Sequence, residues 1–452
     1  METKLRQAEA LLREHGQEHL LEVLGRASGE QQESLTEQIL AIDYRALKEV
    51  GTQTEEKRDA ELAPIPSLDA EQWSERERES FAEAGWAELK AGRVGVIVVA
   101  GGQGSRLGHD GPKGTMDIGL PSGKLLFQIQ AERLLNVSAR AGRFVPWYIM
   151  TSPDNHDVTA AFFREHGYFG YPEEEIYFFQ QHTMPAIDHA GRLLLSGPAE
   201  INFTASGNGE CFSSLARTGA LADMKRRGLA WLFYYNVDNA LVKMADPAFI
   251  GAAVHFGYPV ATKVVEKKDA GEKVGMACLK DGRPSIVEYT EFPPSLLEER
   301  DAAGRLLFNL GNMSIHLFSL PFIERHADTD VPYHAASKKI VHVDREGRTV
   351  TPEKPNAYKL ERFIFDFFPL AEGMTVLKVN REEEFAPVKN KEGADSPESA
   401  RRLLLALHRR WLLAAGVSEE ELAGQEPEVS PLVSCDGEGL DAKTVRELLD
   451  HG

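Results

Sequence analysis

The sequence predicts an α/β fold with a Rossmann-like, mostly parallel mixed sheet flanked by helices. A helical N-terminal part precedes the sheet, and a small C-terminal part follows it. From residue 93 on, apolar strand-like runs alternate with helical segments, which is the pattern of right-handed βαβ units. The strand-like runs are RVGVIVVA (93–100), FVPWYIM (144–150), IYFFQQ (176–181), LAWLFYYNVD (229–238), PVATKVV (259–265) and LGNMSIHLF (310–318).

Other segments complete this outline. Helices are expected at KLLFQIQAERLL (124–135), DVTAAFFREHG (157–167), FSSLARTGALADMKRRG (212–228), SPESARRLLLALHRRWLLAAG (396–416) and DAKTVRELLDHG (441–452). Two short strands around Asp281-Gly282 predict a hairpin. We therefore divide the chain into a helical region at 1–92, a catalytic domain at 93–375 and a C-terminal region at 376–452.

The N-terminal region begins with leucines at helical spacing up to about residue 50. Pro64 and Pro66 then mark a linker or an extended wrap. Ser67 or Asp69 is the expected cap of the helix that follows. The side chains available for burial on that helix are Trp73, Phe81, Trp86 and Leu89.

Composition excludes several classes of protein. The net charge is −19 and no dense Lys/Arg run occurs, so nucleic acid is not an expected partner. No run of about 18 apolar residues predicts a membrane span. The N-terminus lacks the pattern of a signal peptide, and Cys211, Cys278 and Cys435 are far apart, so we expect a cytoplasmic protein without disulfides.

The stretch VVAGGQGSRLGHDGPKG (98–114) follows a buried-looking strand, where α/β sheets bind ligands. A dinucleotide loop fits poorly, because Leu107 stands where the third glycine is required. GLPSGKLL (119–126) is not a P-loop, since it has one residue too few between its glycines and Leu125 replaces the hydroxyl. A polyphosphate site explains more: glycine N–H groups, the planar Arg106 and the point charge of Lys113 all suit phosphate oxygens.

GGQGSRLGHDGPKG (101–114) resembles the signature loop of the eukaryotic-type UDP-sugar pyrophosphorylases, with the UDP-N-acetylglucosamine branch nearest. Ser105 replaces the usual threonine. The resemblance implies a nucleotidyltransferase (GT-A-like) fold and residue roles that this and the following segments carry. It makes Arg106 and Lys113 catalytic, and it assigns the nucleotide to the backbone of Gly101, Gly102 and Gly104.

Further segments follow in the order of the family. FFQQHTMPAID (178–188) places Gln181 at the uracil, while His182 stands where relatives have glycine and receives no role. SGNGECFSSL (206–215) resembles the turn whose Gly207 and Asn208 contact uridine, although a plain turn with a helix cap explains it equally. YYNVDNAL (234–241) ends a strand with Asp238, which the resemblance makes the Mg²⁺ ligand; an isolated aspartate there would be a cap.

The sugar is expected at two later segments. VGMACLKDGRPSIVEYTEF (274–292) is similar to the family's sugar-binding hairpin, so Glu288 and Tyr289 would reach the sugar hydroxyls. FNLGNMSIHLFS (308–319) assigns Asn312 to the acetamido region, and His316 is expected to be structural. KPNAYKLERFIFDFFPLA (354–371) makes Lys359 a phosphate ligand, the alternative being a solvated helix-face lysine. EFAPVKN (384–390) and EVSPLVSCDGEGL (428–440) match further segments, so the resemblance covers about residues 93–440.

The reaction that the resemblance implies joins UTP and a sugar 1-phosphate into UDP-sugar and pyrophosphate, with Mg²⁺ as cofactor. N-acetylglucosamine 1-phosphate is the expected sugar substrate. The phosphate attacks the α-phosphorus in line and is already ionised, so no general base is required. Three alternatives stay open: glucose 1-phosphate or broad sugar specificity, a silent nucleotide-sugar binding protein, and a dehydrogenase with an imperfect loop. The sequence does not predict the oligomeric state.

Overall fold

The computed structural model describes residues 2–44, 47, 60–344 and 346–441. The chain forms two compact units, each assembled from three segments. The smaller unit comprises residues 1–60, 181–211 and 330–366, and the larger unit comprises 61–180, 212–329 and 367–452. The three regions expected from the sequence, with boundaries at residues 92 and 375, remain a prediction.

The larger unit contains a mixed sheet of 11 strands among the described residues, which confirms the predicted fold class. Its main path runs β2-β20-β12-β15-β11-β3-β4-β5. Neighbours on this path are parallel except β15, which is antiparallel to both β12 and β11. The strands are β1 (Leu62–Pro64), β2 (Leu68–Asp69), β3 (Val94–Val99), β4 (Trp147–Thr151), β5 (Ile176–Gln180), β11 (Trp231–Asn236), β12 (Val260–Glu266), β13 (Met276–Lys280), β14 (Arg283–Val287), β15 (Leu310–Ser319) and β20 (Met374–Val379).

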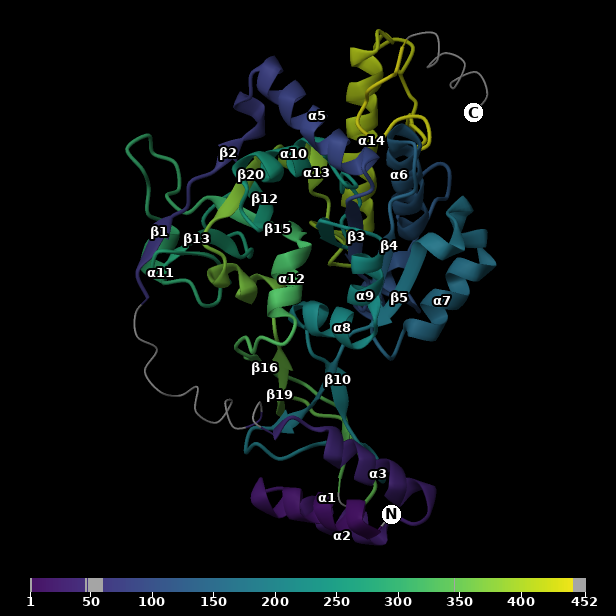
Figure 1. The fold of residues 1–452 in the computed structure, drawn as a ribbon, viewed down its shortest axis with the longest axis vertical. Coiled ribbons are helices and arrows are strands. Elements are labelled where there is room, and N and C mark those ends of the chain that lie inside the picture. The colour runs from purple at the N-terminus through teal and green to yellow at the C-terminus, as the bar shows by residue number, and fades with distance from the viewer. Residues whose placement is uncertain (1, 45–46, 48–59, 345, 442–452) are drawn as a thin grey trace. The chain divides into compact units, whose positions relative to one another are not determined.

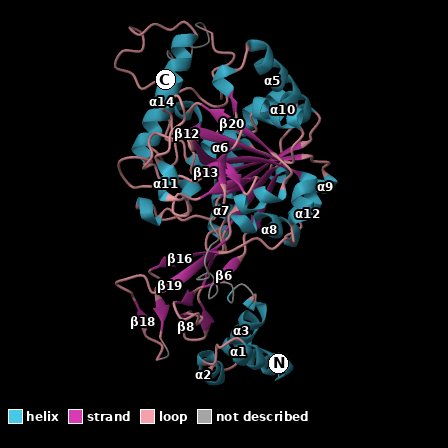
Figure 2. Ribbon diagram, turned by 90° about the vertical axis from the view of Figure 1, so that its left-hand side faces the viewer, coloured by secondary structure: helices cyan, strands magenta, loops and turns pink. Residues whose placement is uncertain are grey.

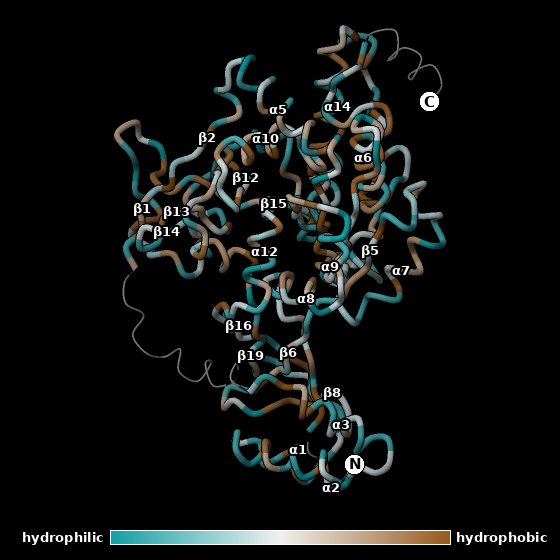
Figure 3. Tube along the Cα trace, viewed as in Figure 1, coloured by the Kyte–Doolittle hydropathy of each residue, from teal (hydrophilic) through white to brown (hydrophobic). Residues whose placement is uncertain are grey.

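Helices cover both faces of this sheet, as Figures 1 and 2 show. One face packs against the helices α5 (Glu75–Lys90), α6 (Leu126–Ala141), α7 (His156–Glu165) and α10 (Pro247–Phe256). Phe212 and Phe322, which lie on α8 (Cys211–Arg217) and α12 (Leu320–His326), contact Phe318 of β15 on the other face. Both faces are therefore apolar, and the hydropathy colouring shows hydrophobic stretches along the sheet strands (Figure 3).

Local turn chemistry explains several boundaries. Asp281 and Gly282 have φ values of 50° and 75°, so β13 and β14 form the predicted tight hairpin. The segment predicted as one helix at 212–228 is interrupted at Gly219, whose φ is 82°, and forms α8 and α9 (Ala220–Arg226).

The predicted cap of α5 was wrong. Ser74, not Ser67 or Asp69, caps this helix, through a capping box with Glu77. Asp69 instead caps a short 3₁₀ turn. The chain before it is extended, because β1 pairs with β13 and β2 pairs with β20. The extended wrap suggested by Pro64 and Pro66 is thus confirmed.

The smaller unit combines three helices with short strands. The helices α1 (Glu2–Glu14), α2 (His19–Arg26) and α3 (Glu30–Ala41) confirm the helical start, and their leucines pack together with Ile187 and Leu195. Gln17 ties the helices to a strand connection, because its amide donates to Gly191 O at 2.9 Å and accepts from Leu193 N. The strands are β6 (Thr183–Pro185), β7 (Ile187–Asp188), β8 (Leu195–Gly197), β9 (Glu200–Ile201), β10 (Phe203–Ala205), β16 (His334–Lys338), β17 (His342–Val343), β18 (Thr349–Val350) and β19 (Ala357–Glu361).

The C-terminal part of the larger unit contains α13 (Arg381–Glu384) and the predicted long helix, α14 (Pro397–Ala414). Residues up to 441 then return to α6, where Arg140 forms ion pairs with Asp436 and Glu438. The helix predicted at 441–452 lies outside the described residues from 442 on. Within the described ranges, no helix has both the length and the apolar character that a membrane span requires.

Candidate active site

The glycine-rich loop and Asp238 leave the sheet at the same edge. β3 and β11 are adjacent and parallel, and Val99 pairs with Asn236 at their ends. The loop begins directly after β3, and Asp238 lies two residues beyond β11. This is the carboxyl edge, where open α/β sheets bind ligands.

The glycine-rich loop is held as a narrow hairpin by its own backbone. Lys113 N donates to Gly102 O at 3.1 Å, and Gly104 N donates to Gly111 O at 2.9 Å. Within the described chain, the N–H groups of Gly101 and Gly102 donate to no protein acceptor. A Cβ added at Gly102 would meet no heavy atom within 4 Å, so the backbone at Gly102 is open to the approach of a ligand.

Lys113 and Asp238 come together across this edge. Lys113 Nζ donates to Asp238 Oδ2 at 3.4 Å, and their side chains are 19% and 16% exposed. Arg106 lies on the same loop, is exposed, and forms no ion pair or side-chain hydrogen bond among the residues that the structure describes. The site thus has one cation paired with the carboxylate and a second one directed to solvent.

Residues 384–391 also lie at this site, although the sequence alone predicted no functional residue among them. Val388 N donates to Asp238 O at 2.9 Å, so the exposed Lys389 follows directly beside the Asp238 turn. Lys391 reaches the glycine-rich loop: its Cε would lie 3.5 Å from a Cβ added at Gly108. The segment EFAPVKN was visible in the sequence, but only the folded backbone places Lys389 next to the residue that bonds Asp238; its Nζ lies 5.8 Å from the centre of the Phe385 ring.

A divalent cation fits this site only if it is coordinated jointly by the protein and by the substrate. No group of three or more His, Cys, Asp or Glu side chains suited to a metal occurs among the described residues. Asp238 is a single carboxylate, 16% exposed, and its one side-chain partner among the described residues is Lys113 of the glycine-rich loop. Such a donor set suits a hard cation that takes most of its oxygens from substrate phosphates and water.

The predicted sugar-binding residues form a second cluster in the larger unit. Asn312 N donates to Gly275 O at 2.8 Å, and Glu288 Oε1 would lie 3.0 Å from a Cβ added at Gly275. Gly275 was missed from the sequence, although it lies within the matched segment. Tyr289 is 37% exposed at the end of the hairpin. The structure therefore brings Glu288 and Asn312 to one place.

The orientation of the Asn312 amide follows from its hydrogen bond. Asn312 Oδ1 accepts from Ser314 N at 2.9 Å, so Nδ2 is the group left to meet a ligand. Ser314 has a φ of 55° at a bulge where β15 shifts register against Lys263 and Val264 of β12. The bulge thus orients the Asn312 amide so that its Nδ2 donor is the group left for a ligand.

The smaller unit fixes Asn208 in the same way. Asn208 Oδ1 accepts from Ile364 N at 2.9 Å, which leaves its Nδ2 as a donor. Gly207 has a φ of 87°, and a Cβ there would lie 2.4 Å from Arg362 O, so only glycine fits. Arg362 in turn pairs with Glu210 at 3.2 Å.

The other predicted residues of the smaller unit occupy different settings. Gln181 is 6% exposed. Lys359 lies on the strand β19, not on a helix, and its Nζ donates to Glu361 Oε1 at 2.7 Å. The backbone carbonyl of His182 accepts from Ser206 Oγ, while its side chain is exposed.

His316 lies in the core of the larger unit, as the sequence analysis expected. It is fully buried, its Nδ1 lies 2.9 Å from Thr262 Oγ1, and burial lowers its pKa to about 3. The neutral ring stacks on Tyr234. Its contacts are those of a packed core residue.

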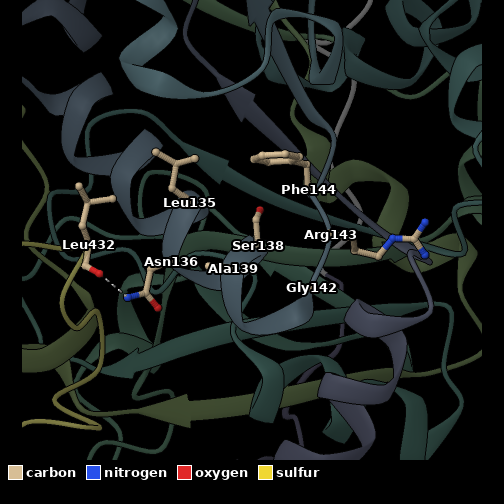
Figure 4. Close-up of a pocket in the computed structure, with 8 residues that line it drawn as sticks. All are labelled: Leu135, Asn136, Ser138, Ala139, Gly142, Arg143, Phe144 and Leu432. Carbon is tan, nitrogen blue, oxygen red and sulfur yellow. Dashed lines mark hydrogen bonds between the residues drawn. The ribbon is translucent and has the colours of Figure 1, made fainter.

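A pocket of about 430 Å³ lies elsewhere on the larger unit (Figure 4). Asn136 Nδ2 donates to Leu432 O at its rim, and the pocket contains none of the predicted site residues. The lining residues are Leu135, Asn136, Ser138, Ala139, Gly142, Arg143, Phe144 and Leu432.

Comparisons with known proteins identify the family of this chain. The model of the family described as UTP--glucose-1-phosphate uridylyltransferase matches residues 44–441. A chain with this match is an enzyme of the nucleotidyltransferase class, which acts on small nucleotide and sugar-phosphate substrates and generally uses a divalent metal. The chain belongs to the UTP--glucose-1-phosphate uridylyltransferase family.

Relatives extend over nearly the whole chain. UDP-N-acetylhexosamine pyrophosphorylase-like protein 1 of Homo sapiens is 38% identical, over 96% of this chain and 93% of that protein. UDP-N-acetylglucosamine pyrophosphorylase of Saccharomyces cerevisiae is 40% identical, over 84% and 82%. The crystal structure of the uridine diphosphate N-acetylglucosamine pyrophosphorylase of Trypanosoma brucei superposes with a TM-score of 0.85 at 30% identity, covering 99% of this chain and 96% of that one.

Proposed function

We propose that this enzyme transfers uridylyl from UTP to N-acetylglucosamine 1-phosphate, releasing pyrophosphate. The observation that carries the proposal is the Lys113–Asp238 pair on a glycine-rich loop whose Gly101 and Gly102 N–H groups bind no protein acceptor among the described residues. This combination suits a triphosphate with a divalent cation and does not suit a dinucleotide. Relatives whose names specify the N-acetylglucosamine reaction support the choice of sugar.

Electrostatic repulsion between the two anionic substrates is the main barrier that the site must lower. Two unit charges 4 Å apart repel by about 4 kcal/mol near a protein surface, and here both the attacking phosphate and the triphosphate are anionic. Arg106, Lys113 and Lys389 are proposed to offset this repulsion from the larger unit. Each would stabilise charge that moves onto the pyrophosphate leaving group.

Mg²⁺ is the proposed cation, with Asp238 as its protein ligand. When bound, it would neutralise phosphate charge and align the oxygens of the triphosphate. Lys113, now within 3.4 Å of Asp238, is then free to bind a phosphate oxygen instead. Because the sugar phosphate attacks as an ionised oxygen, no side chain need remove a proton.

The remaining predicted residues are proposed to bind the sugar, the uridine and a phosphate. Asn312 presents an amide donor, which matches the carbonyl oxygen of an acetamido group. Glu288 is an acceptor for sugar hydroxyls, and Tyr289 lies next to it. In the smaller unit, Gln181, Gly207 and Asn208 are proposed to bind uridine, and Lys359 a phosphate; their support is the match to the family's segments.

We also propose a cytoplasmic location. Cys211, Cys278 and Cys435 are free, which suits a reducing compartment.

The direct test supplies UTP, N-acetylglucosamine 1-phosphate and Mg²⁺ to the purified protein and measures pyrophosphate. We expect stoichiometric pyrophosphate and UDP-N-acetylglucosamine, with loss of activity in EDTA that added Mg²⁺ restores. Binding of UDP-N-acetylglucosamine without turnover would identify a silent binding protein instead. Lys113→Ala protein purified in the same way, for which we expect a strongly lowered rate, is the control for contaminating activity.

A further inference from the structure

Asn239, next to Asp238, is a buried side chain whose hydrogen bonds all go to backbone. It is 2% exposed. Its Nδ2 donates to Glu384 O at 2.7 Å, and its Oδ1 accepts from Ala386 N at 2.9 Å and from Leu241 N at 3.1 Å. One amide therefore joins the turn that carries Asp238 to the segment that carries Lys389.

The backbone around Asn239 completes this junction. Ala240 N donates to Ala386 O at 3.1 Å, and Val388 N donates to Asp238 O at 2.9 Å. The Asp238 turn and residues 384–388 thus run side by side for a few residues, although they are almost 150 positions apart in the sequence. No other described side chain spans both segments at this point through donor and acceptor together.

Each segment is also held from behind by a buried cation. Arg133 of α6 is fully buried and its guanidinium donates to Ala240 O at 2.8 Å and to Val242 O at 3.1 Å. Lys263 of β12 binds the carboxylate of Glu384. Arg133 and Lys263 thus hold one segment each, while Asn239, with the backbone bonds beside it, joins the two segments to one another.

We propose that Asn239 is a positioning residue, which holds Lys389 in place relative to Asp238 for uridylyl transfer. The inference rests on the proposed function, since it requires that Asp238 and Lys389 act on the same polyphosphate. Asn239 itself is 2% exposed and its amide bonds backbone groups, so it does not face a substrate. Its effect must therefore pass through the residues on either side.

The informative variant is Asn239→Asp, which keeps the shape and the two accepting bonds. It replaces the Nδ2 donor by an oxygen that faces Glu384 O, so the two segments separate. A misplacement of about 1 Å costs on the order of 100-fold in rate, so we expect kcat to fall by about that factor while KM for UTP changes little. Mn²⁺ binding in the presence of UTP, measured by electron paramagnetic resonance, should weaken as well.

Asn356→Asp is the matched control. Asn356 also bridges backbone with both amide atoms, accepting from Ile340 N and donating to Ile340 O, but it lies in the smaller unit. An equal fall of kcat in both variants would mean a general folding defect and would overturn the proposal. If Asn239→Asp does not fold, Asn239→Ser, which keeps an accepting hydroxyl, takes its place in every comparison.

A double-mutant cycle with Lys389→Met tests whether Asn239 affects the rate through Lys389. If Asn239 acts through Lys389, the double variant should have nearly the kcat of Lys389→Met alone. Independent, multiplying losses would contradict the inference while leaving the proposed function intact. Full activity of Lys389→Met and Asp238→Ala would instead refute the proposed roles themselves.

Discussion

The two clusters in the larger unit solve different problems on one sheet. Around Asp238, parallel strands end together and the groups presented to a ligand are charges and bare N–H groups. Around Asn312, an antiparallel strand bulges and the groups are an oriented amide and a carboxylate. Charges act over distance and tolerate many phosphates, whereas an oriented amide distinguishes acceptors from donors. We therefore expect the first cluster to control rate and the second to control which sugar is used.

Lys113→Ala should give the largest effect and would sharpen this contrast most. Loss of a cation that stabilises leaving-group charge should lower kcat by about 10²- to 10³-fold, as removal of one preorganised donor does. KM for the sugar phosphate should change far less. Steady-state kinetics with Lys225→Ala, whose exposed pair with Glu324 lies outside both clusters, provide the control. A change confined to KM for the sugar phosphate would contradict the assignment of Lys113 to the cluster that controls the rate.

Asn312→Asp should have the next largest effect, on the opposite parameter. The carboxylate can still accept from Ser314 N, but it replaces the donor with a negatively charged acceptor. We expect kcat/KM for N-acetylglucosamine 1-phosphate to fall by about 10- to 100-fold, since a buried unmatched polar group costs about 1–3 kcal/mol. KM for UTP should stay within error. Asn202→Asp, at a half-buried site of the smaller unit, is the charge-matched control.

Ser314 tests whether the bulge itself is required. Ser314→Val places a β-branched residue at a φ of 55°, so we expect a loss of unfolding free energy of about 1–3 kcal/mol and a raised KM for the sugar phosphate. Ser314→Gly accepts this φ and should keep both values near those of the parent. Chemical denaturation and sugar-phosphate kinetics measure the pair. Equal behaviour of the two variants would show that the backbone conformation is unimportant.

The smallest expected effect concerns pH. Burial lowers the pKa of His316 and of His408 to about 3, below the usual value of 6.5, so the unfolded chain binds protons that the folded chain does not. The stability they contribute is complete above pH 6.5 and is lost as pH falls towards 3. Each histidine adds up to about 1.4 kcal/mol per pH unit to this slope. Urea denaturation between pH 7 and 5 gives the unfolding free energy at each pH. This free energy should depend less steeply on pH for His316→Gln than for the parent. An equal pH dependence in both proteins would exclude His316 as a cause.

Local patterns in the sequence predicted the elements that depend on neighbours along the chain. The apolar runs became strands, and Asp281-Gly282 formed its hairpin, because both depend on short-range conformation. Ser74 was missed as a cap because Ser67 and Asp69 offered equivalent signals a few residues earlier. Asn239, Gly275 and Lys389 could not be selected, because their roles depend on contacts between distant segments.

The most direct measurement is the rate of pyrophosphate release with UTP and a panel of sugar 1-phosphates. The panel contains the N-acetylglucosamine, N-acetylgalactosamine and glucose forms, tested on the parent enzyme and on Asn312→Asp. We predict that the parent prefers the N-acetylated sugars and that Asn312→Asp loses this preference while it still turns over. Equal kcat/KM for glucose 1-phosphate and N-acetylglucosamine 1-phosphate in the parent would contradict the account.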